Sequence, residues 1–357
     1  MTSIHHKRAL RISVDLAAIQ HNFAIAVANS GGQNLFAVVK ADAYGHGSVR
    51  VATALEQADG FAVVTLAEAV ELRDASIKKP ILVLQSARDQ HECEAFLHYK
   101  LWPVIHCIDQ LQWFAQVANR HQLQAWIKID TGMGRLGFQP DELKKVLSAD
   151  YGLTWFGALT HFASADEPEN RLTERQIRLF NSLTQYMDVQ RSLANSAAIL
   201  AWPGSQAHWA RPGIMLYGSN PVRSPLTKKV PLKLAMRVTA PLISLKRYNA
   251  GDSIGYAASY RCAAPTRIGY IAIGYGDGLP RVLDRHASVF LNGQICPIVG
   301  RASMDTIAID LSRAPNAKLG DEALLWGIEH PIEILANSAN TVSYELMTSI
   351  RGPRMYI

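Results

Sequence analysis

Short apolar runs alternate with segments of helical period through the first two thirds of the chain. The runs are residues 35–39, 60–66, 80–84, 101–106, 125–130, 153–161, 192–195 and 207–211. Each run has the length and composition of a buried strand. The segments between them, such as 108–118 and 173–187, repeat apolar residues at the spacing of a helix face. Strands that alternate with helices in this way predict an α/β fold, a (β/α)₈ TIM-like barrel.

The pattern changes beyond residue 230, where period-two and β-branched runs dominate. The runs are residues 234–244, 267–273, 287–291, 295–299 and 306–311. Turn sequences such as Gly251-Asp252 and Asn292-Gly293 separate them, and one helical stretch is expected at 331–338. The barrel is therefore expected to be followed by a mainly β C-terminal domain.

The length of 357 residues also favours two domains, because a single core rarely grows this large. Ser224-Pro225 and Lys228-Lys229 mark an exposed segment of the kind that joins domains. We therefore place the barrel domain at residues 1–230 and the β domain at residues 231–357.

Composition is that of an ordinary globular protein and argues against several function classes. The 36 Lys and Arg residues exceed the 30 Asp and Glu residues only slightly and form no long run, which disfavours a nucleic-acid surface. No apolar stretch is long enough for a signal peptide or a membrane span. The four cysteines lie far apart, so neither a metal site nor a disulfide framework is expected, and a reducing, cytoplasmic location is favoured.

One lysine, Lys40, stands at the end of the first apolar run. Residues 35–39 are predicted to form a buried strand, and Lys40 is the first polar residue after it. A lysine at the dry end of a strand loses hydration of its charged form, which lowers its pKa. The neutral amine can then form a Schiff base with an aldehyde. The alternative for a single lysine is that its amine extends to solvent.

Polar segments also follow other predicted barrel strands, at the face where barrel enzymes place their active sites. With Lys40 they are residues 131–138, 160–163, 195–196 and 211–214. Taken singly, His161 fits a core histidine, Arg135 a surface cation and Gly213 an ordinary turn. The prediction of an active site depends on their coincidence at one rim.

The last two strand ends have the features of a phosphate site. In barrels, phosphate commonly binds backbone N–H groups after strands seven and eight. Ser196 supplies a hydroxyl and an amide at the start of a helical stretch, and Gly213 and Ile214 supply further amides. If the eight strands close into a barrel, these residues predict a phosphate-binding site about a cofactor's length from Lys40.

Eight segments spread over both domains carry a specific family likeness. They are VVKADAYGHG from 38, TGMGRLGF from 131, THFASADE from 160, NSAA from 195, RPGIMLYG from 211, GYAASY from 255, IGYGDGLPR from 273 and VGRASMD from 299. In order and spacing they resemble the alanine racemases, whose first segment carries pyridoxal 5′-phosphate (PLP) on its lysine. The resemblance implies a PLP-dependent enzyme that interconverts L-alanine and D-alanine, and a homodimer whose active sites are shared between subunits.

The resemblance also implies a role for each matching residue. Lys40 would hold PLP and act as one catalytic base, and Tyr256 of the other subunit would be the opposite base. The cofactor would further contact Tyr44, Arg135, His161, Asn195, Ser196, Arg211, Gly213 and Ile214. The substrate would contact Arg135, Met304 and Asp305, and its entrance would be lined by Tyr275 and Arg301. No metal is implied.

Racemisation gives these roles a physical basis. The α-proton leaves one face of a planar intermediate and returns to the other, so two acid–base groups must flank it, as Lys40 and Tyr256 would. A tyrosine needs nearby positive charge to act as a base, which Arg211 and a hydrogen-bonded His161 would supply. Arg211 would face the pyridine nitrogen without giving up its proton. The ring would then be a weaker electron sink, which limits transamination.

Lys128 and Ile350 are two positions at which the resemblance leaves the chemistry open. Lys128 matches a lysine that many family members carry as a carbamate, which would neutralise and orient Arg135, but the sequence does not reveal the modification. The stretch before residues 351–354 is slightly short, and Ile350 stands near the position where some relatives place a phosphate-binding tyrosine. Cofactor affinity would then depend more on Tyr44 and Ser196.

Other functions stay open at this point. A broad-specificity or serine-preferring racemase of the same fold would differ mainly in pocket volume, and a methyl-sized difference is worth only about 1–3 kcal/mol. PLP-dependent decarboxylases of this barrel type keep an acidic residue beside a cysteine in the second domain. This chain has Ser303-Met304-Asp305 there, which disfavours a decarboxylase. A non-catalytic PLP-binding protein of this type is a bare barrel. The predicted β domain with Tyr256 argues against that alternative. For an alanine racemase, D-alanine supply for peptidoglycan and alanine catabolism are alternative roles.

Overall fold

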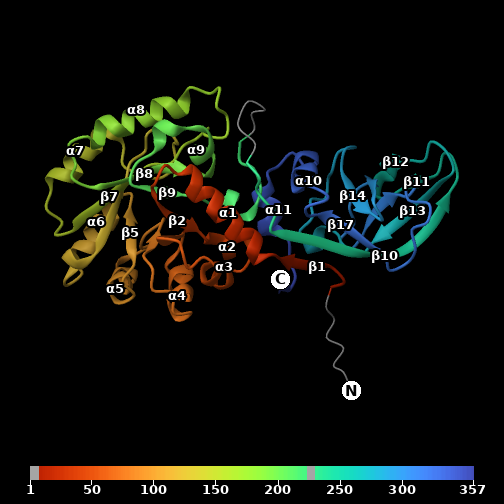
Figure 1. Cartoon of the computed structure of the whole chain (residues 1–357), viewed down its shortest axis with the longest axis horizontal. Helices are drawn as coiled ribbons and strands as arrows, with labels where there is room; N and C mark the ends of the chain where they lie inside the picture. Colours follow the sequence, from red (N-terminus) through yellow and green to blue (C-terminus); the bar gives the residue numbers. More distant parts are fainter. Residues whose placement is uncertain (1–7, 223–229) are drawn as a thin grey trace, which may run out of the picture. The chain divides into compact units, whose positions relative to one another are not determined.

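The computed structural model describes residues 8–222 and 230–357 (Figure 1). The chain forms two compact units. The first comprises Ile19–Leu232, and the second comprises the residues up to Ala18 together with Lys233–Ile357. The linker signals expected at 224–225 and 228–229 lie outside the described residues.

The first unit is a closed barrel of parallel strands. Its strands are β2 (Asn34–Val38), β3 (Gly60–Val63), β4 (Ile81–Val83), β5 (Trp102–Ile105), β6 (Gln124–Lys128), β7 (Thr154–Leu159), β8 (Gln190–Asn195) and β9 (Trp209–Arg211). β9 closes the barrel by pairing with β2, with Trp209 opposite Asn34. Each strand overlaps one of the eight apolar runs, so the predicted (β/α)₈ barrel is confirmed.

Helices precede and connect the barrel strands. The α-helices are α1 (Leu16–Asn29), α2 (Lys40–Gly45), α3 (Ser48–Ala54), α4 (Leu66–Asp74), α5 (Gln90–His98), α6 (Ile108–Ala115), α7 (Pro140–Ser148), α8 (Leu172–Thr184) and α9 (Ser196–Ala201). The 3₁₀ helices are η1 (Arg120–Gln122), η2 (Pro203–Ser205) and η3 (Ile214–Tyr217). The Asp15 carboxylate caps α1 by accepting a hydrogen bond from Ala18 N at 2.9 Å. None of the described helices is long and apolar enough to cross a membrane.

Aromatic side chains fill the inside of the barrel. They come from the first three residues of five strands: Phe36, Trp102, Trp126, Phe156 and Trp209. Phe36 stacks on Trp209 with ring centroids 4.1 Å apart and meets Trp126 edge-on at 5.8 Å. Because β2 and β6 are not neighbours in the barrel, the contact between Phe36 and Trp126 runs through its interior. A Cβ at Gly157 would lie only 2.5 Å from the Trp126 ring, so a glycine on β7 makes room for the indole.

The second unit is built on an eight-stranded sheet, which confirms the mainly β C-terminal domain. Its strands are β1 (Arg11–Val14), β10 (Met236–Tyr248), β13 (Thr266–Ile271), β14 (Ser288–Leu291), β15 (Gln294–Val299), β16 (Ile307–Asp310), β17 (Glu322–Trp326) and β18 (Arg354–Tyr356). β10 also pairs with β13, which closes a ring in the order β13-β16-β15-β14-β17-β10. The other elements are the hairpin β11 (Ser253–Ile254) and β12 (Tyr260–Arg261), η4 (Tyr256–Ala258), η5 (Tyr275–Asp277), α10 (Ile332–Ser338) and α11 (Ser343–Ser349).

Residues 11–14 form a strand, β1, that belongs to the second unit and not to the barrel. Residues 11–14 were included in the barrel domain of residues 1–230, but they pair with β10 and β18 in the sheet of the second unit. Ile12 and Val14 are fully buried there. Both partners lie more than 200 residues away, since Arg11 is opposite Thr239, so the local pattern carries no sign of this pairing. Strands β17 and β18 and helix α11 were not predicted either.

Candidate active site

Lys40 directly precedes a turn of left-handed backbone. Residues 41–44 all have φ between 51° and 54°. This conformation costs a residue other than glycine about 1–2 kcal/mol, so four in succession need support from outside the turn. Ser48 N donates to the Asp42 carboxylate at 2.8 Å, and Gly47 N donates to the Asp42 carbonyl at 2.9 Å. The direction in which Lys40 leaves β2 therefore depends on tertiary contacts.

The Lys40 amine is largely removed from water and lies among cations. Loss of hydration is the main reason that its pKa lies below the ordinary value, and the Arg135 guanidinium lowers it further. The Glu68 carboxylate opposes this effect, while Arg211 adds a smaller lowering. The lowered pKa of Lys40 agrees with the expectation from its position at the end of a strand.

Arg211 ends β9 with its side chain buried in the rim. Nη1 donates to Ser192 Oγ at 2.5 Å, and Nη2 donates to the carbonyls of Thr160 at 2.5 Å and Leu193 at 3.3 Å. No carboxylate in the described ranges pairs with this guanidinium. Burial lowers the pKa of Arg211 to about 10, so the side chain keeps its charge at neutral pH.

His161 follows β7 beside this arginine. Removal of the ring from water, followed by the charge of Arg211, holds the pKa of His161 well below its ordinary value. Arg135, Lys128 and Lys40 add to the effect. The hydrogen bond expected between His161 and Arg211 is not formed among the residues that the structure describes; the guanidinium donates to Ser192 Oγ and to two backbone carbonyls. The imidazole is therefore neutral at physiological pH and acts on Arg211 only through space.

Arg135 is presented by a loop that folds around one carboxylate. An oxygen of Asp130 accepts hydrogen bonds at 2.9, 2.9 and 3.2 Å from the N–H groups of Gly132, Met133 and Gly134. Gly137 has a φ of 126°, and a Cβ there would approach Asp130 N to 2.8 Å, so only glycine fits. The loop is thus rigid at its base, while the Arg135 side chain is exposed.

Lys128 is a buried lysine at the end of β6. Its pKa falls to about 8, mainly because burial removes water and then because of repulsion from Arg135, Arg211 and Lys40. Asp130 opposes the lowering but forms no ion pair with Lys128 within the described part of the chain. The site therefore holds an excess of positive charge.

The predicted phosphate position is a small cradle of polar groups from three segments. Ser196 Oγ accepts hydrogen bonds from Gly213 N at 2.7 Å and Met215 N at 3.4 Å, which joins the end of β8 to the loop after β9. A Cβ on Gly213 would lie 2.7 Å from the Tyr44 hydroxyl. Tyr44, from the left-handed turn, thus borders the same place as Ser196 and Gly213.

Neighbouring residues hold this cradle in place. Asn195 caps α9, its side-chain oxygen accepting an N–H of the first helical turn at 3.0 Å. Ile214 is buried at the start of η3. Tyr217 lies against Tyr44 with ring centroids 4.8 Å apart, and its hydroxyl donates to the Val38 carbonyl at 2.7 Å. The cradle is therefore tied to the strand that leads to Lys40.

The remaining predicted site residues lie on adjoining loops of the second unit. They are Tyr256, Tyr275, Arg301, Met304 and Asp305. Tyr275 N donates to the Ser303 carbonyl at 3.0 Å, and Gly276 N donates to the Met304 carbonyl at 2.9 Å. A Cβ on Gly255 would lie 3.6 Å from Arg301 N, so the Tyr256 loop adjoins the same segment. Tyr256 and Met304 are 56% and 52% exposed in the single chain, which leaves both side chains open to a partner.

Ile350 follows α11 in the second unit. Its side chain is 1% exposed, and its N–H donates to the Leu346 carbonyl at 3.2 Å. Ile350 is therefore a core residue there, and its side chain offers no polar group for a phosphate.

Two residues of the barrel rim escaped the sequence analysis. The Glu68 carboxylate binds the amide of Ala41 at 2.8 Å, beside Lys40. Gln176 is fully buried on α8, and its Nε2 donates to the His161 carbonyl at 3.0 Å. The Thr65-x-x-Glu68 spacing of a capping box marks Glu68 at a helix start, but not its second contact. Nothing local marks Gln176, because a helical glutamine is usually a surface residue.

Both units match family models. Residues 14–221 match the model described as "Alanine racemase, N-terminal domain", and residues 235–356 match "Alanine racemase, C-terminal domain". The chain is 39% identical over 347 residues to the alanine racemase of Coxiella burnetii (strain RSA 331 / Henzerling II), which covers 95% of each chain. It is 41% identical over 342 residues to the alanine racemase of Azoarcus sp. (strain BH72), covering 95% of this chain and 96% of that one.

Solved structures are similar along the whole chain. The biosynthetic alanine racemase from Pseudomonas aeruginosa superposes with a TM-score of 0.94 at 40% identity, covering 98% of this chain and 99% of that one. An alanine racemase from Bartonella henselae with covalently bound pyridoxal phosphate superposes with a TM-score of 0.88 at 29% identity, covering 98% and 99%.

Proposed function

Because the chain belongs to the alanine racemase family, as its motifs predict, we propose that it interconverts L-alanine and D-alanine with PLP as its cofactor. The observation that carries the proposal is the cluster at the barrel rim. There a lysine of lowered pKa, Lys40, lies among the charges of Arg135 and Arg211. The cradle of Tyr44 and Gly213 adjoins the strand that leads to this lysine.

The residues at the rim fit PLP by their chemistry. Lys40 offers an amine that can condense with an aldehyde. Ser196, Tyr44 and the amides of Gly213 and Ile214 would hold the phosphate, and a Cβ at position 213 would fill the space between them. Arg211 would face the pyridine nitrogen, with His161 behind it and Asn195 near the cofactor. When bound, PLP withdraws electrons from the α-carbon of an amino acid and makes its proton removable.

Two bases would move that proton. The Lys40 amine would take or give it on one face of the substrate, and the Tyr256 phenol of a partner subunit would do so on the other. The exposure of Tyr256 in the single chain supports a role across an interface. Of the two groups expected to supply positive charge near Tyr256, Arg211 keeps its charge at neutral pH, whereas the ring of His161 is neutral.

Arg211 would also limit side reactions. Its guanidinium keeps its proton at neutral pH and donates to Ser192 and two carbonyls. It would therefore not give up a proton to the pyridine nitrogen. Without that proton on the ring, electron withdrawal by the cofactor would stay moderate. Moderate withdrawal favours return of the proton to the α-carbon over transamination.

Arg135 would bind the phenolic oxygen of PLP and the carboxylate of alanine. Lys128, whose pKa is about 8, has a neutral form accessible near physiological pH. Reaction of that amine with carbon dioxide releases a proton and gives a carbamate, whose negative charge would offset the cations of the site and orient Arg135. The excess of positive charge around Lys128 supports this modification.

The β domain was expected at residues 231–357, and the second unit contains most of it. This unit would complete the active site of a partner subunit in a two-fold dimer. Met304 and Asp305 would line the substrate position there, and Tyr275 and Arg301 would line its entrance. We expect the enzyme to act in the cytoplasm, supplying D-alanine for peptidoglycan or serving alanine catabolism.

The test combines absorbance with an exchange assay. Purified protein should show the near-ultraviolet and violet absorbance of lysine-bound PLP, and it should convert either enantiomer of alanine to the racemate, with solvent deuterium entering the α-position. Bound PLP without exchange of either enantiomer would instead support a binding protein. Faster exchange of serine than alanine would support a serine-preferring racemase.

A further inference from the structure

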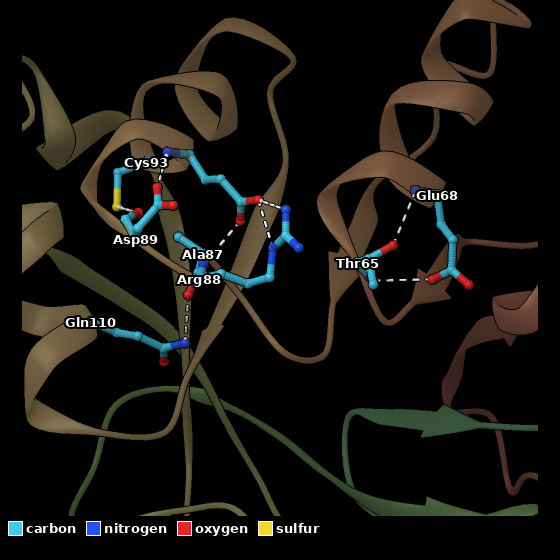
Figure 2. A network of polar contacts seen from close by, with 8 residues as sticks. Thr65, Glu68, Ala87, Arg88, Asp89, Cys93 and Gln110 are labelled. Atoms are coloured by element: carbon cyan, nitrogen blue, oxygen red, sulfur yellow. Dashed lines mark hydrogen bonds and ion pairs between the residues drawn. The ribbon is translucent and has the colours of Figure 1, made fainter.

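The carboxylate of Glu68 connects two loops at the barrel rim. Oε2 accepts hydrogen bonds from Val64 N at 2.8 Å and Thr65 N at 3.0 Å. Thr65 Oγ1 accepts one from Glu68 N at 3.3 Å, and the two contacts between Thr65 and Glu68 form the capping box of α4 (Figure 2). Oε1 reaches the other loop and accepts a hydrogen bond from Ala41 N at 2.8 Å. A capping box needs only the two contacts between Thr65 and Glu68. The bond to Ala41 is additional.

Ala41 is the first residue of the left-handed turn that follows Lys40. Asp42, the second residue of the turn, ties it to the segment that follows by accepting hydrogen bonds from Gly47 N and Ser48 N. Glu68 supplies a contact at the start of the turn. Because the residues of this turn are not glycine, their conformation persists only where surrounding groups fix it.

Glu68 is also the carboxylate that acts on the Lys40 amine. The charged groups around this amine are Arg135 and Arg211, which repel its proton, and Glu68, which attracts it. Lys128 is a further cation of the same cluster. The Glu68 oxygens are already bound to three backbone N–H groups, so their position relative to the cluster is fixed.

We propose that Glu68 is a positioning residue for Lys40: it fixes the turn that aims the lysine at the cofactor, and its charge balances the neighbouring arginines. The inference rests on the proposed function, because it concerns the same lysine. It goes beyond that function by assigning a role to a residue at the start of α4 that would touch neither cofactor nor substrate.

A purely structural cap is the competing explanation, and the chain offers variants that separate the two. Thr65→Ala removes the hydroxyl of the capping box but leaves the Glu68 carboxylate and its bond to Ala41. Glu68→Gln removes the charge and keeps an amide oxygen that can still accept a hydrogen bond. Glu71→Gln is the matched control, because Glu71 is an exposed carboxylate on the same helix.

The first measurement uses PLP-free protein and no alanine. Competitive acetylation at a series of pH values, with mass spectrometry of the Lys40 peptide, follows the neutral amine, which is the only form that reacts. Glu68→Gln should move the midpoint of Lys40 reactivity to lower pH, because the negative charge that opposes the arginines is gone. Glu71→Gln and Thr65→Ala should leave it unchanged. An unchanged midpoint in Glu68→Gln overturns the electrostatic part of the proposal.

The second measurement is the rate at which PLP-free protein becomes covalently linked to added PLP, scaled to the fraction of neutral Lys40. Glu68→Ala should slow linkage by about tenfold or more, since a misplaced reacting group loses much of its rate. Thr65→Ala should lower the melting temperature without comparable slowing. Equal slowing in both variants at equal stability would reduce Glu68 to a helix cap and overturn the positioning role.

If Glu68→Ala does not fold, the comparison of Glu68→Gln with Glu71→Gln decides the proposal. Neither measurement requires racemisation. A wild-type protein that links PLP but does not exchange alanine would therefore contradict the proposed function alone. Normal racemisation with no effect of Glu68→Gln on Lys40 would contradict this inference alone.

Discussion

The Tyr44 hydroxyl lies so close to Gly213 that a Cβ on the glycine would stand 2.7 Å from it. The tyrosine belongs to the left-handed turn after Lys40, and the glycine to the loop after β9. Since Ser196 Oγ binds the Gly213 amide at 2.7 Å, the three residues enclose one small polar space. This geometry makes Gly213 the most direct test of the phosphate position.

Gly213→Ala should weaken PLP binding. The added methyl group meets the Tyr44 hydroxyl, and overpacking of this kind costs about 1–3 kcal/mol. The dissociation constant for PLP, measured by equilibrium dialysis of PLP-free protein, should therefore rise roughly tenfold or more. Gly204→Ala is the control, because a Cβ at Gly204 meets nothing within 4 Å. Equal affinity in both variants would place the phosphate elsewhere.

Lys40→Ala should abolish covalent attachment of PLP and slow racemisation by several powers of ten, because one residue is proposed both to anchor the cofactor and to act as a base. Mass spectrometry after borohydride reduction reports the attachment, and polarimetry reports the rate. The exposed lysine variant Lys78→Ala should behave as wild type. Turnover near the wild-type rate in Lys40→Ala would remove the central assignment.

Arg211→Glu should change the product as well as the rate. A carboxyl group in place of the fixed guanidinium charge allows the pyridine nitrogen of PLP to hold a proton, so more pyruvate should form per racemisation event. Arg211→Lys keeps the positive charge and should not raise pyruvate formation. If Arg211→Glu only binds PLP more weakly, Arg211 acts through its hydrogen bonds to Ser192 and the strand ends.

In buffer free of carbon dioxide, where Lys128 is unmodified, Lys128→Met should stabilise the protein near neutral pH. Burial and the neighbouring cations lower the pKa of Lys128 from 10.5 to about 8, so the folded state carries the full cost of a buried charge below pH 8. That cost disappears as the pH rises from about 8 to 10.5, because in this range the unfolded state binds more protons than the folded state. The shift corresponds to roughly 3 kcal/mol. Urea unfolding should therefore show the largest gain for Lys128→Met at pH 7 and little gain near pH 10.

A carbamate on Lys128 would alter this result in a specific way. The modified side chain carries no positive charge, so Lys128→Met would give no gain in stability in buffer that contains bicarbonate. The gain would appear after carbon dioxide is removed. A gain that is equal with and without bicarbonate would exclude the carbamate.

Variants that are inactive as homodimers should restore activity when combined. If each site takes Lys40 from one chain and Tyr256 from the other, a mixed dimer of Lys40→Ala and Tyr256→Ala has one intact site. Random assembly makes about half the dimers mixed, so about a quarter of all sites should be active. Co-expression with two affinity tags isolates these dimers. No activity in verified mixed dimers would mean that Tyr256 acts within its own chain or has no role in catalysis.

The sequence predicted the barrel well because each of its strands is marked locally. The apolar run 35–39 followed by Lys40 is an example, since both the strand and the polar residue at its end are visible without knowledge of distant contacts. Residues 11–14, which form β1, were assigned to the barrel domain for the opposite reason. Its partner residues, such as Thr239 opposite Arg11, lie in another part of the sequence, so its four residues carry no sign of which unit they join.

Details of the site were missed where a side chain has more than one available partner. Residues 41–44 include no glycine, so nothing in the sequence favours a left-handed turn, which is imposed by contacts such as that of Glu68 with Ala41. The expected bond between His161 and Arg211 is replaced by bonds from the guanidinium to Ser192 and backbone carbonyls. Spacing along the chain indicates that two groups are near one another, but not which atoms pair.

The aromatic cluster inside the barrel has an optical consequence. Trp102, Trp126 and Trp209 lie among the strands whose far ends would hold PLP, and Trp126 is shielded from water. Indoles emit light at wavelengths that overlap the absorption of PLP, so excitation energy should pass from these tryptophans to a bound cofactor. The intrinsic fluorescence of the protein should therefore dim as the barrel is loaded. The chain would carry its own reporter of cofactor occupancy, readable without a dye or a substrate.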